Sequence, residues 1–228
     1  MLMRSFTMTK TAPISIRNVV SITSGEYHSF AIDTRGHVWG WGFNGFGEAG
    51  DSKSPGRDSA SVSLPIKIKA LSGRGVVHLA GGAHHSAAVT SDGTCLVWGR
   101  RDDGQLGVDF TPEELADPTL IRHDDRGRLH ICLQPVVVDT IGPAAHVACG
   151  TDHTIFVTRS GTVYSTGFNA QGQLGLGKEY EDIDEIHVAT QVVGGKEIQN
   201  QKRHITWAGA SGQFSIVAGP RIVLGVKD

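Results

Sequence analysis

Three histidines stand in the same short phrase, Gly-x-x-His-Ser/Thr, which places an imidazole beside a hydroxyl. Histidine is the side chain most often used as a general base, so the phrase could carry catalysis. The three copies are Gly25-Glu26-Tyr27-His28-Ser29, Gly82-Ala83-His84-His85-Ser86 and Gly150-Thr151-Asp152-His153-Thr154. A catalytic group has no reason to recur at every step of an array. We therefore interpret His28, His85 and His153 as structural residues, each tying a loop to a buried carbonyl.

Two other patterns suggest a metal or a nucleotide, and neither is supported by its surroundings. His84 and His85 are adjacent, but neighbouring residues on an extended segment point to opposite sides. No cysteine or carboxylate stands at zinc-ligand spacing beside them, so we expect no metal site. The string Gly40-Trp41-Gly42-Phe43-Asn44-Gly45 has the letters of G-x-G-x-x-G. That motif requires a helix to follow within a βαβ unit, and none is expected here, so we predict no cofactor.

The elements that position the histidines are predicted to be short strands. Each phrase is followed by a turn glycine, by a second glycine six residues later and by a Gly-x-x-Gly pair. In the first copy, strands are expected at 18–23, 29–33, 37–43 and 64–68. No segment has convincing helical periodicity. An all-β fold of repeated four-stranded sheets is typical of a β-propeller, and a sandwich or an open solenoid is the alternative.

The copies define a repeat array with anchors at Gly25, Gly82 and Gly150. A degraded fourth copy, anchored at Gly209, reads Gly209-Ala210-Ser211-Gly212-Gln213-Phe214-Ser215 and has no histidine. The anchors step by roughly 57, 68 and 59 residues, as repeat proteins do. We predict a poorly ordered N-terminal segment, 1–17, and a partial propeller, 18–228, of three full blades and a partial one.

The repeated phrase, with the Gly-x-Val-Trp-x-Trp-Gly-x-Asn-x-x-Gly-x-x-Gly that follows it, resembles the repeat of the regulator of chromosome condensation family. Residues 18–178 carry the resemblance closely, and 209–215 look like the final repeat of fungal members. The resemblance implies a seven-bladed propeller, with one face engaging the small GTPase Ran and the other the histones of a nucleosome. It implies a nuclear, chromatin-associated guanine-nucleotide exchange factor, a regulator and not a bond-making enzyme. The alternative is an interaction scaffold of the same repeats without exchange activity.

The length of the chain differs from that pattern. Seven blades of about 57 residues would need on the order of 400 residues, whereas the chain has 228. We therefore expect the C-terminal half of such a ring, with a closed four-bladed ring as the alternative. Half a ring has two open faces, so we expect self-association or a complementary propeller half.

Candidate functional residues are those that change from copy to copy within the same loop. The position before the repeated histidine is Tyr27, His84, Asp152 and, in the fourth copy, Ser211. Function tends to lie on variable loops over a rigid frame. The resemblance implies a role for His84 in nucleotide release, because it falls on a matching histidine of the exchange-factor branch. Tyr27, Asp152 and Glu26 are predicted to bind the partner.

Composition excludes several other classes of function. The 21 basic and 23 acidic residues nearly balance, which argues against nucleic-acid binding by bulk electrostatics. The three cysteines are unpatterned, which favours a reducing compartment. No apolar run reaches the roughly 20 residues of a membrane span. The insertion 108–134 is predicted to be a solvated loop between blades.

Overall fold

The computed structural model describes residues 16–56, 60–123, 129–193 and 204–220, and these residues form three complete sheets and one hairpin. The first blade pairs its four strands in chain order; they are β1 (Val19–Ser24), β2 (His28–Asp33), β3 (Val38–Phe43) and β4 (Ser61–Lys67). The second blade has five strands in the order β5-β6-β7-β9-β8. Their bounds are β5 Val76–Gly81, β6 His85–Thr90, β7 Cys95–Arg100, β8 Ile121–His123 and β9 Leu129–Val137.

The third blade repeats the plan of the first, and the last unit stops after two strands. The third blade consists of β10 (Ala144–Cys149), β11 (His153–Thr158), β12 (Val163–Phe168) and β13 (Glu185–Gln191). The last hairpin consists of β14 (Trp207–Ser211) and β15 (Phe214–Ala218). The short helices are α1 (Pro112–Ala116) and the 3-10 turns η1 (Asp139–Ile141) and η2 (Lys178–Tyr180). The predicted all-β fold is confirmed.

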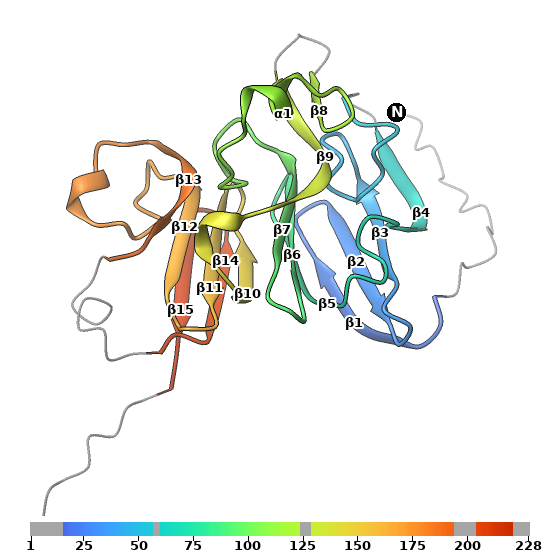
Figure 1. Cartoon of the computed structure of the whole chain (residues 1–228), viewed down its shortest axis with the longest axis horizontal. Helices are drawn as coiled ribbons and strands as arrows, with labels where there is room; N and C mark the ends of the chain where they lie inside the picture. Colours follow the sequence, from blue (N-terminus) through green and yellow to red (C-terminus); the bar gives the residue numbers. More distant parts are fainter. Residues whose placement is uncertain (1–15, 57–59, 124–128, 194–203, 221–228) are drawn as a thin grey trace, which may run out of the picture.

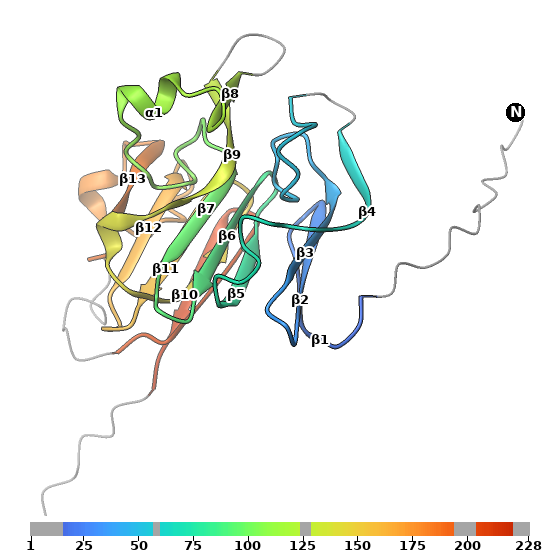
Figure 2. The same ribbon diagram turned by 45° about the vertical axis from the view of Figure 1, so that its right-hand side comes forward.

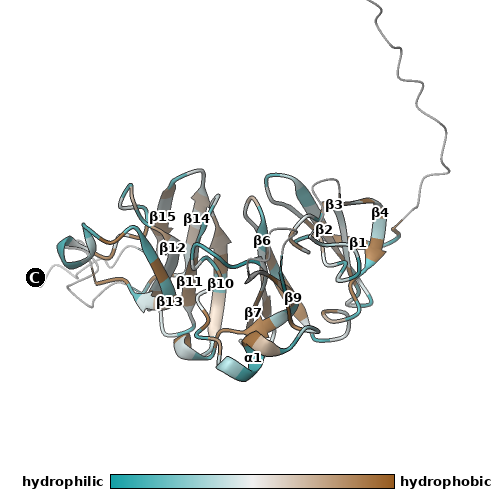
Figure 3. Ribbon diagram, turned by 90° about the horizontal axis from the view of Figure 1, so that it is seen from above, coloured by the Kyte–Doolittle hydropathy of each residue, from teal (hydrophilic) through white to brown (hydrophobic). Residues whose placement is uncertain are grey.

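The blades follow one another around a common axis, which makes the molecule part of a β-propeller. In Figure 1 the second blade lies between the first blade and the third, and the 45° turn of Figure 2 keeps that order. Seen from above, β4 and β13 lie at opposite ends of the row of blades (Figure 3). The innermost strand of each blade contacts the next blade, with β5 against β1, β10 against β5 and β14 against β10.

Hydrophobic side chains fill the space between successive blades. Phe30 of the first blade packs with Leu96 and Trp98 of the second, and Phe156 of the third blade packs with Val97 of the second. A third cluster, which includes Ile155, Leu174 and Ala208, joins the third blade to the last hairpin. Burial of apolar surface between blades therefore holds the arc together, since each of these three clusters draws on two neighbouring units.

The glycine at the end of the third strand of each blade is required by the loop that carries the candidate site. Gly99 has φ +103°, and a Cβ atom there would lie 2.6 Å from the carbonyl oxygen of His84. The amide of the next residue, Arg100, donates to that carbonyl at 2.8 Å. Gly42 and Gly167 have the same geometry against Tyr27 and Asp152. The third strand thus fixes the residue that precedes each repeated histidine.

The insertion 108–134 differs from the solvated loop that the sequence predicted. Thr111 caps α1 through the amide of Glu114, whose side chain bonds back to the Thr111 amide. Ile121 of β8 is buried in the core between the second and third blades, and Leu115 and Leu120 pack against it. Periodicity could not indicate α1 because the helix has five residues. Its capping pair and neighbouring leucines were the available signal.

Two further predictions concern the N-terminal segment and membrane-spanning helices. The N-terminal segment 1–17 lies outside the described residues except for its last two positions. Within the described ranges, no helix is long and apolar enough to cross a membrane.

Candidate functional site

The repeated histidines connect each blade to the next through a hydroxyl group. His28 Nε2 lies 2.7 Å from Ser86 Oγ, and His85 Nε2 lies 2.8 Å from Thr154 Oγ1. His153 Nε2 continues the series at 2.8 Å from Ser215 Oγ. The hydroxyl in each case is the one that follows the histidine position in the next blade. The histidines are therefore structural, but they bind a hydroxyl directly and not the buried carbonyl that the sequence analysis expected.

The carbonyl forms the second part of the same connection. Ser86 Oγ donates to the Glu48 carbonyl at 3.0 Å, and Thr154 Oγ1 donates to the Gln105 carbonyl at 2.7 Å. A hydroxyl has one proton to donate, so it must accept a proton from the histidine. His28 and His85 are therefore the tautomers with hydrogen on Nε2. We call this chain of imidazole, hydroxyl and carbonyl the interblade relay.

Burial keeps the relay histidines neutral. Desolvation lowers the pKa of His28 to about 4, of His85 to about 3 and of His153 to about 4. The Nδ1 atoms of all three are buried and have no hydrogen-bond partner among the described residues. A proton on Nδ1 would place an unpaired charge between two blades, which is costly.

The relay also corrects the register of the fourth copy. Ser215 takes the place of Thr154, so Phe214 stands at the histidine position and Gln213 at the variable position before it. Strand pairing agrees, because Ala210 pairs with Ser215 as Cys149 pairs with Thr154. The anchor of the fourth copy is thus Ser211 and not Gly209. The variable position before the histidine position, assigned to Ser211 from the sequence, is therefore occupied by Gln213. Gly209 resembles the anchor glycine of the other copies, but it lies two residues before the true anchor.

The loops that carry the variable residues meet at one end of the inner strands. They surround a cavity of about 410 Å³ whose lining includes Glu26, Ala83, Thr151 and Gly212. The amide of Glu26 donates to the Gly82 carbonyl at 3.0 Å, and similar bonds join the later loops. We call the exposed side chains at this mouth the rim.

His84 occupies the rim above the first blade. Its ring stacks on Tyr27 with centroids 5.6 Å apart and lies 4.9 Å from the ring of Phe46. His84 Nδ1 is 3.5 Å from Glu48 Oε1, whose side chain is fully buried. The His84 side chain is 26% exposed, whereas the neighbouring His85 has no exposed surface. Adjacent histidines therefore face different environments, one on the rim and one between blades.

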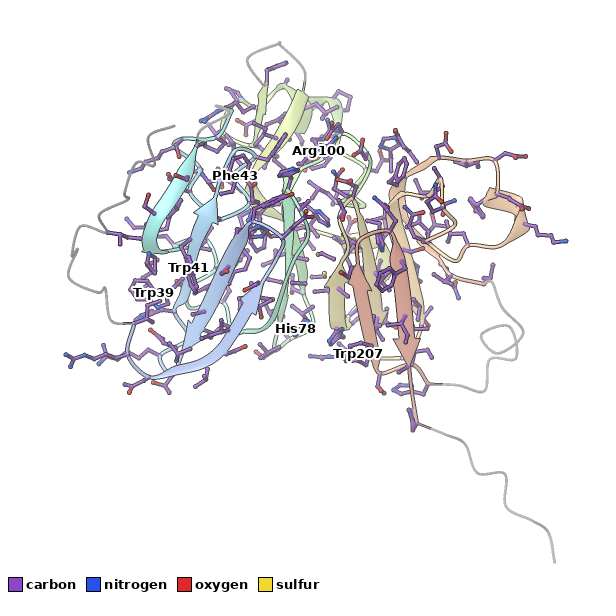
Figure 4. The ribbon with its side chains drawn as sticks, turned by 180° about the vertical axis from the view of Figure 1, so that it is seen from behind. Trp39, Trp41, Phe43, His78, Arg100 and Trp207 are labelled. Carbon is purple, nitrogen blue, oxygen red and sulfur yellow. The ribbon has the colours of Figure 1, made fainter. Side chains whose placement is uncertain are left out.

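Arg100 links His84's loop to Asp152 of the third blade. Its guanidinium contacts Asp152 at 3.1 Å, Asp102 at 2.6 Å and Asp103 at 3.0 Å. Burial opposes its charge, but the hydrogen bond to Asp102 and the three carboxylates raise the pKa of Arg100. Burial raises the pKa of Asp152, and the charge of Arg100 partly offsets this. Figure 4 shows Arg100 and Phe43 at the opposite end of the sheets from His78 and Trp207.

Tyr27 and Glu26 complete the predicted set on the first blade. Tyr27 is 53% exposed, and a hydrogen bond from its hydroxyl to Glu26, together with the charge of Glu26, raises its pKa. The structure therefore brings Tyr27 against His84 and joins Asp152 to the same rim through Arg100.

Sequence reasoning missed three residues that contact the rim histidine or its loop: the partly buried Phe46 and Arg100, and the fully buried Glu48. Glu48 replaces the glutamine found at the same place in later blades, Gln105 and Gln173. Each of these side chains accepts from a backbone amide two residues earlier. The available signal was a carboxylate at a position where the repeat otherwise has an amide. Burial raises the pKa of Glu48, and His84 is the nearest titratable partner for it.

The rim carries aromatic, cationic and acidic side chains, among them Tyr27, Arg100 and Asp152. Within the described ranges, no group of three or more histidine, cysteine, aspartate or glutamate side chains could hold a metal ion. The exposed surface of Tyr27 and the paired charges around Arg100 are suited to contact with another macromolecule.

Repeated four-stranded blades, with a polar rim that varies from blade to blade, define the molecule as part of a β-propeller repeat protein. Residues 3–217 match the RCC1-like domain. The chain therefore belongs to the RCC1-like domain family.

Fungal proteins of this family are similar to the chain over part of their length. Protein pim1 of Schizosaccharomyces pombe is 35% identical over 207 residues, which are 91% of this chain and 36% of that protein. Guanine nucleotide exchange factor SRM1 of Saccharomyces cerevisiae is 30% identical over 210 residues, 92% of this chain and 41% of that protein. The chain thus spans about two fifths of the length of these relatives.

A solved structure shows the same fold. The chain matches the crystal structure of Prp20p from Saccharomyces cerevisiae with a TM-score of 0.79 at 28% identity. Prp20p is described together with its binding to Gsp1p and histones. The match covers 91% of this chain and 45% of that one. The prediction of a partial propeller of this family is confirmed.

Proposed function

We propose that the chain is part of a guanine-nucleotide exchange factor for the small GTPase Ran, acting at chromatin in the nucleus. Support comes from its membership of the family that includes the exchange factor SRM1. The single observation that carries the proposal is the rim, where His84, Tyr27 and Asp152 lie on neighbouring blades of one face. Histones are proposed as a second partner, by analogy with the solved relative.

The mechanism is a difference in binding affinity. An exchange factor binds the nucleotide-free GTPase better than the nucleotide-bound form, and it weakens nucleotide binding by the same factor. A 10⁴-fold weakening requires about 5.5 kcal/mol of differential affinity. His84 can donate or accept a hydrogen bond and is supported by Glu48 and by two aromatic rings. It is therefore positioned to contact GTPase loops that are exposed only when the nucleotide leaves.

An exchange assay separates this function from that of a non-catalytic scaffold. Ran loaded with a fluorescent GDP analogue is mixed with excess unlabelled GDP, and release is followed with and without the 228-residue chain. We expect the chain to accelerate release and His84→Ala to reduce the acceleration by about tenfold, a loss of about 1.4 kcal/mol. Asp92→Ala, in a turn on the second blade away from the rim, is the matched control and should retain activity.

If the folded chain does not accelerate nucleotide release, the result favours the non-catalytic scaffold. Equal activity of His84→Ala and the native chain would remove His84 from the proposed role while leaving the family assignment intact.

A further inference from the structure

The buried residue that follows the first glycine of a Gly-x-x-Gly pair lies close to the variable residue of the next blade. In the first blade this residue is Glu48, whose Oε1 is 3.5 Å from Nδ1 of His84. In the third blade it is Gln173, whose side-chain amide donates to the side-chain oxygen of Gln213. His84 and Gln213 each directly precede the histidine position of their copy. Two interfaces thus place a buried side chain against the variable residue of the following blade.

The interface between the second and third blades has the same buried position and a different contact. Gln105 is fully buried, and its Nε2 has no hydrogen-bond partner among the described residues. The variable residue of the third blade is Asp152, which Arg100 holds instead, at 3.1 Å. The residue that supports the variable position therefore differs from blade to blade.

A backbone amide determines which end of the buried side chain faces the variable residue. In the third blade the amide of Gln171 donates to Oε1 of Gln173 at 2.9 Å, and the second blade has the same bond. The oxygen is the only acceptor of a glutamine side chain, so the NH₂ group is left to face the variable residue. In the first blade the amide of Phe46 donates to Oε2 of Glu48 at 2.8 Å, which leaves the second carboxylate oxygen. Glu48 therefore accepts a hydrogen bond where glutamine donates one.

The carboxylate of Glu48 determines the tautomer of His84. An ionised carboxylate only accepts hydrogen bonds, so the ring nitrogen that faces it must carry the hydrogen. Burial raises the pKa of Glu48, and its hydrogen bonds with His84 and with backbone amides oppose that rise. In the neutral ring, the hydrogen is then on Nδ1 and the lone pair is on Nε2. The buried relay histidines have the opposite tautomer.

The lone pair of His84 is accessible to another molecule. Nε2 of His84 forms no hydrogen bond with a described residue, and it is not buried. The stacked ring of Tyr27 and the nearby ring of Phe46 restrict rotation of the imidazole. The charge of His84 also acts on Asp152, one of three carboxylates that surround the single charge of Arg100. These acidic surroundings favour a donor that carries a positive charge.

We infer that Glu48 is a positioning residue that makes His84 a hydrogen-bond acceptor at the rim, for an N–H or ammonium donor of the partner. Glu48 receives the hydrogen of Nδ1, and Nε2 receives the hydrogen of the partner's donor. Glutamine at this position reverses the arrangement, because its NH₂ group donates to Nδ1 and leaves the hydrogen on Nε2. The identity of the partner rests on the proposed function, whereas the tautomer rests on the contact between Glu48 and His84 alone.

Nitrogen NMR of the imidazole rings tests the tautomer without a partner. Spectra of the 228-residue chain are recorded at pH 8.5, above the usual titration range of histidine. The signals of His84 are those that disappear in His84→Ala. We expect an unprotonated Nε2 in the native chain and a protonated Nε2 in Glu48→Gln. His28 and His85 should carry hydrogen on Nε2 in both proteins, which also shows that the variant keeps the fold.

Glu26→Gln is the matched control, because it makes the same chemical change at the rim. Glu26 forms its hydrogen bond with Tyr27, so the tautomer of His84 should not change in this variant. Three results would overturn the inference: hydrogen on Nε2 of His84 in the native chain, an unchanged tautomer in folded Glu48→Gln, or the same change in Glu26→Gln. The tautomer in the native chain decides the question even where Glu48→Gln does not fold.

Nucleotide release from Ran measures the consequence for the partner. We expect Glu48→Gln to reduce the acceleration by between about twofold and tenfold, as for the loss of one hydrogen bond. In the His84→Ala background, Glu48→Gln should have little further effect, because Glu48 acts through the ring. Additive losses in the double variant would contradict the positioning role. If the native chain does not accelerate release but has the expected tautomer, the proposed function fails and the role of Glu48 in orienting His84 stands.

Discussion

Two adjacent histidines show how one residue type serves two purposes in the same loop. His85 is buried and forms a hydrogen bond with Thr154 of the next blade, whereas His84 lies on the rim among aromatic rings. The repetition of Gly-x-x-His was enough to predict the first role from sequence. It was also enough to place His84 on a variable position. The repetition could not identify Arg100 or Glu48, because each contacts a side chain of a neighbouring blade.

The two histidines should therefore differ on substitution. His85→Ala leaves the relay without its donor and should lower the free energy of unfolding by about 1–3 kcal/mol. His84→Ala should leave the melting temperature nearly unchanged, because its ring is partly exposed and its contact with Glu48 is at the limit of a hydrogen bond. Thermal melts followed by circular dichroism check both. An early melt for His84→Ala together with a native-like melt for His85→Ala would mean that the roles are reversed.

At the scale of elements, the sequence repeat predicts the strands of each blade and their order. It does not predict segments that occur in one copy alone. Four strands per blade followed from glycine spacing and apolar runs, and the first and third blades have that form. The additional strand β8 and helix α1 of the second blade were not predicted, because a single insertion has no sister copy for comparison. The register of the last hairpin was misjudged for a related reason. Without a histidine in this copy, the register is identified by the contact of His153 with Ser215 and by the pairing of β14 with β15.

The relay between blades should make stability depend on pH. Burial lowers the pKa of His28 to about 4 and of His85 to about 3, from an ordinary value of 6.5. The unfolded chain therefore binds more protons than the folded one as the pH falls below 6.5. Stability is full above that value and is lost as the pH drops toward 4 and below. Each such histidine contributes up to about 1.4 kcal/mol per pH unit in this window.

Urea unfolding at pH 7, 6 and 5 measures this dependence. His85→Gln keeps a side-chain amide that can donate to Thr154 but cannot titrate. Its free energy of unfolding should change less steeply with pH than that of the native chain. Parallel pH profiles for the two proteins would show that His85 does not control the acid sensitivity.

At the scale of the whole molecule, the described blades form an arc with one mouth, where the variable loops meet, and two ends that differ from each other. The mouth gathers the loops that vary, and the ends expose apolar residues such as Ile22 and Phe214. Partial coverage of the family fold was predictable from length, because the repeat period is regular. The asymmetry of the ends was not predictable, since it depends on the register by which Phe214 takes the place of a histidine.

We propose that the rim distinguishes the nucleotide-free from the nucleotide-bound state of a GTPase. Ran is immobilised in nucleotide-free and in GDP-bound form, and the affinity of the chain is measured for each by biolayer interferometry. A ligand shifts an equilibrium only by its differential affinity for the two states. We expect the chain to bind nucleotide-free Ran at least about tenfold more tightly than GDP-bound Ran, and His84→Ala to lose most of this preference. Equal affinity for the two forms, or a preference for the GDP-bound form, would contradict it.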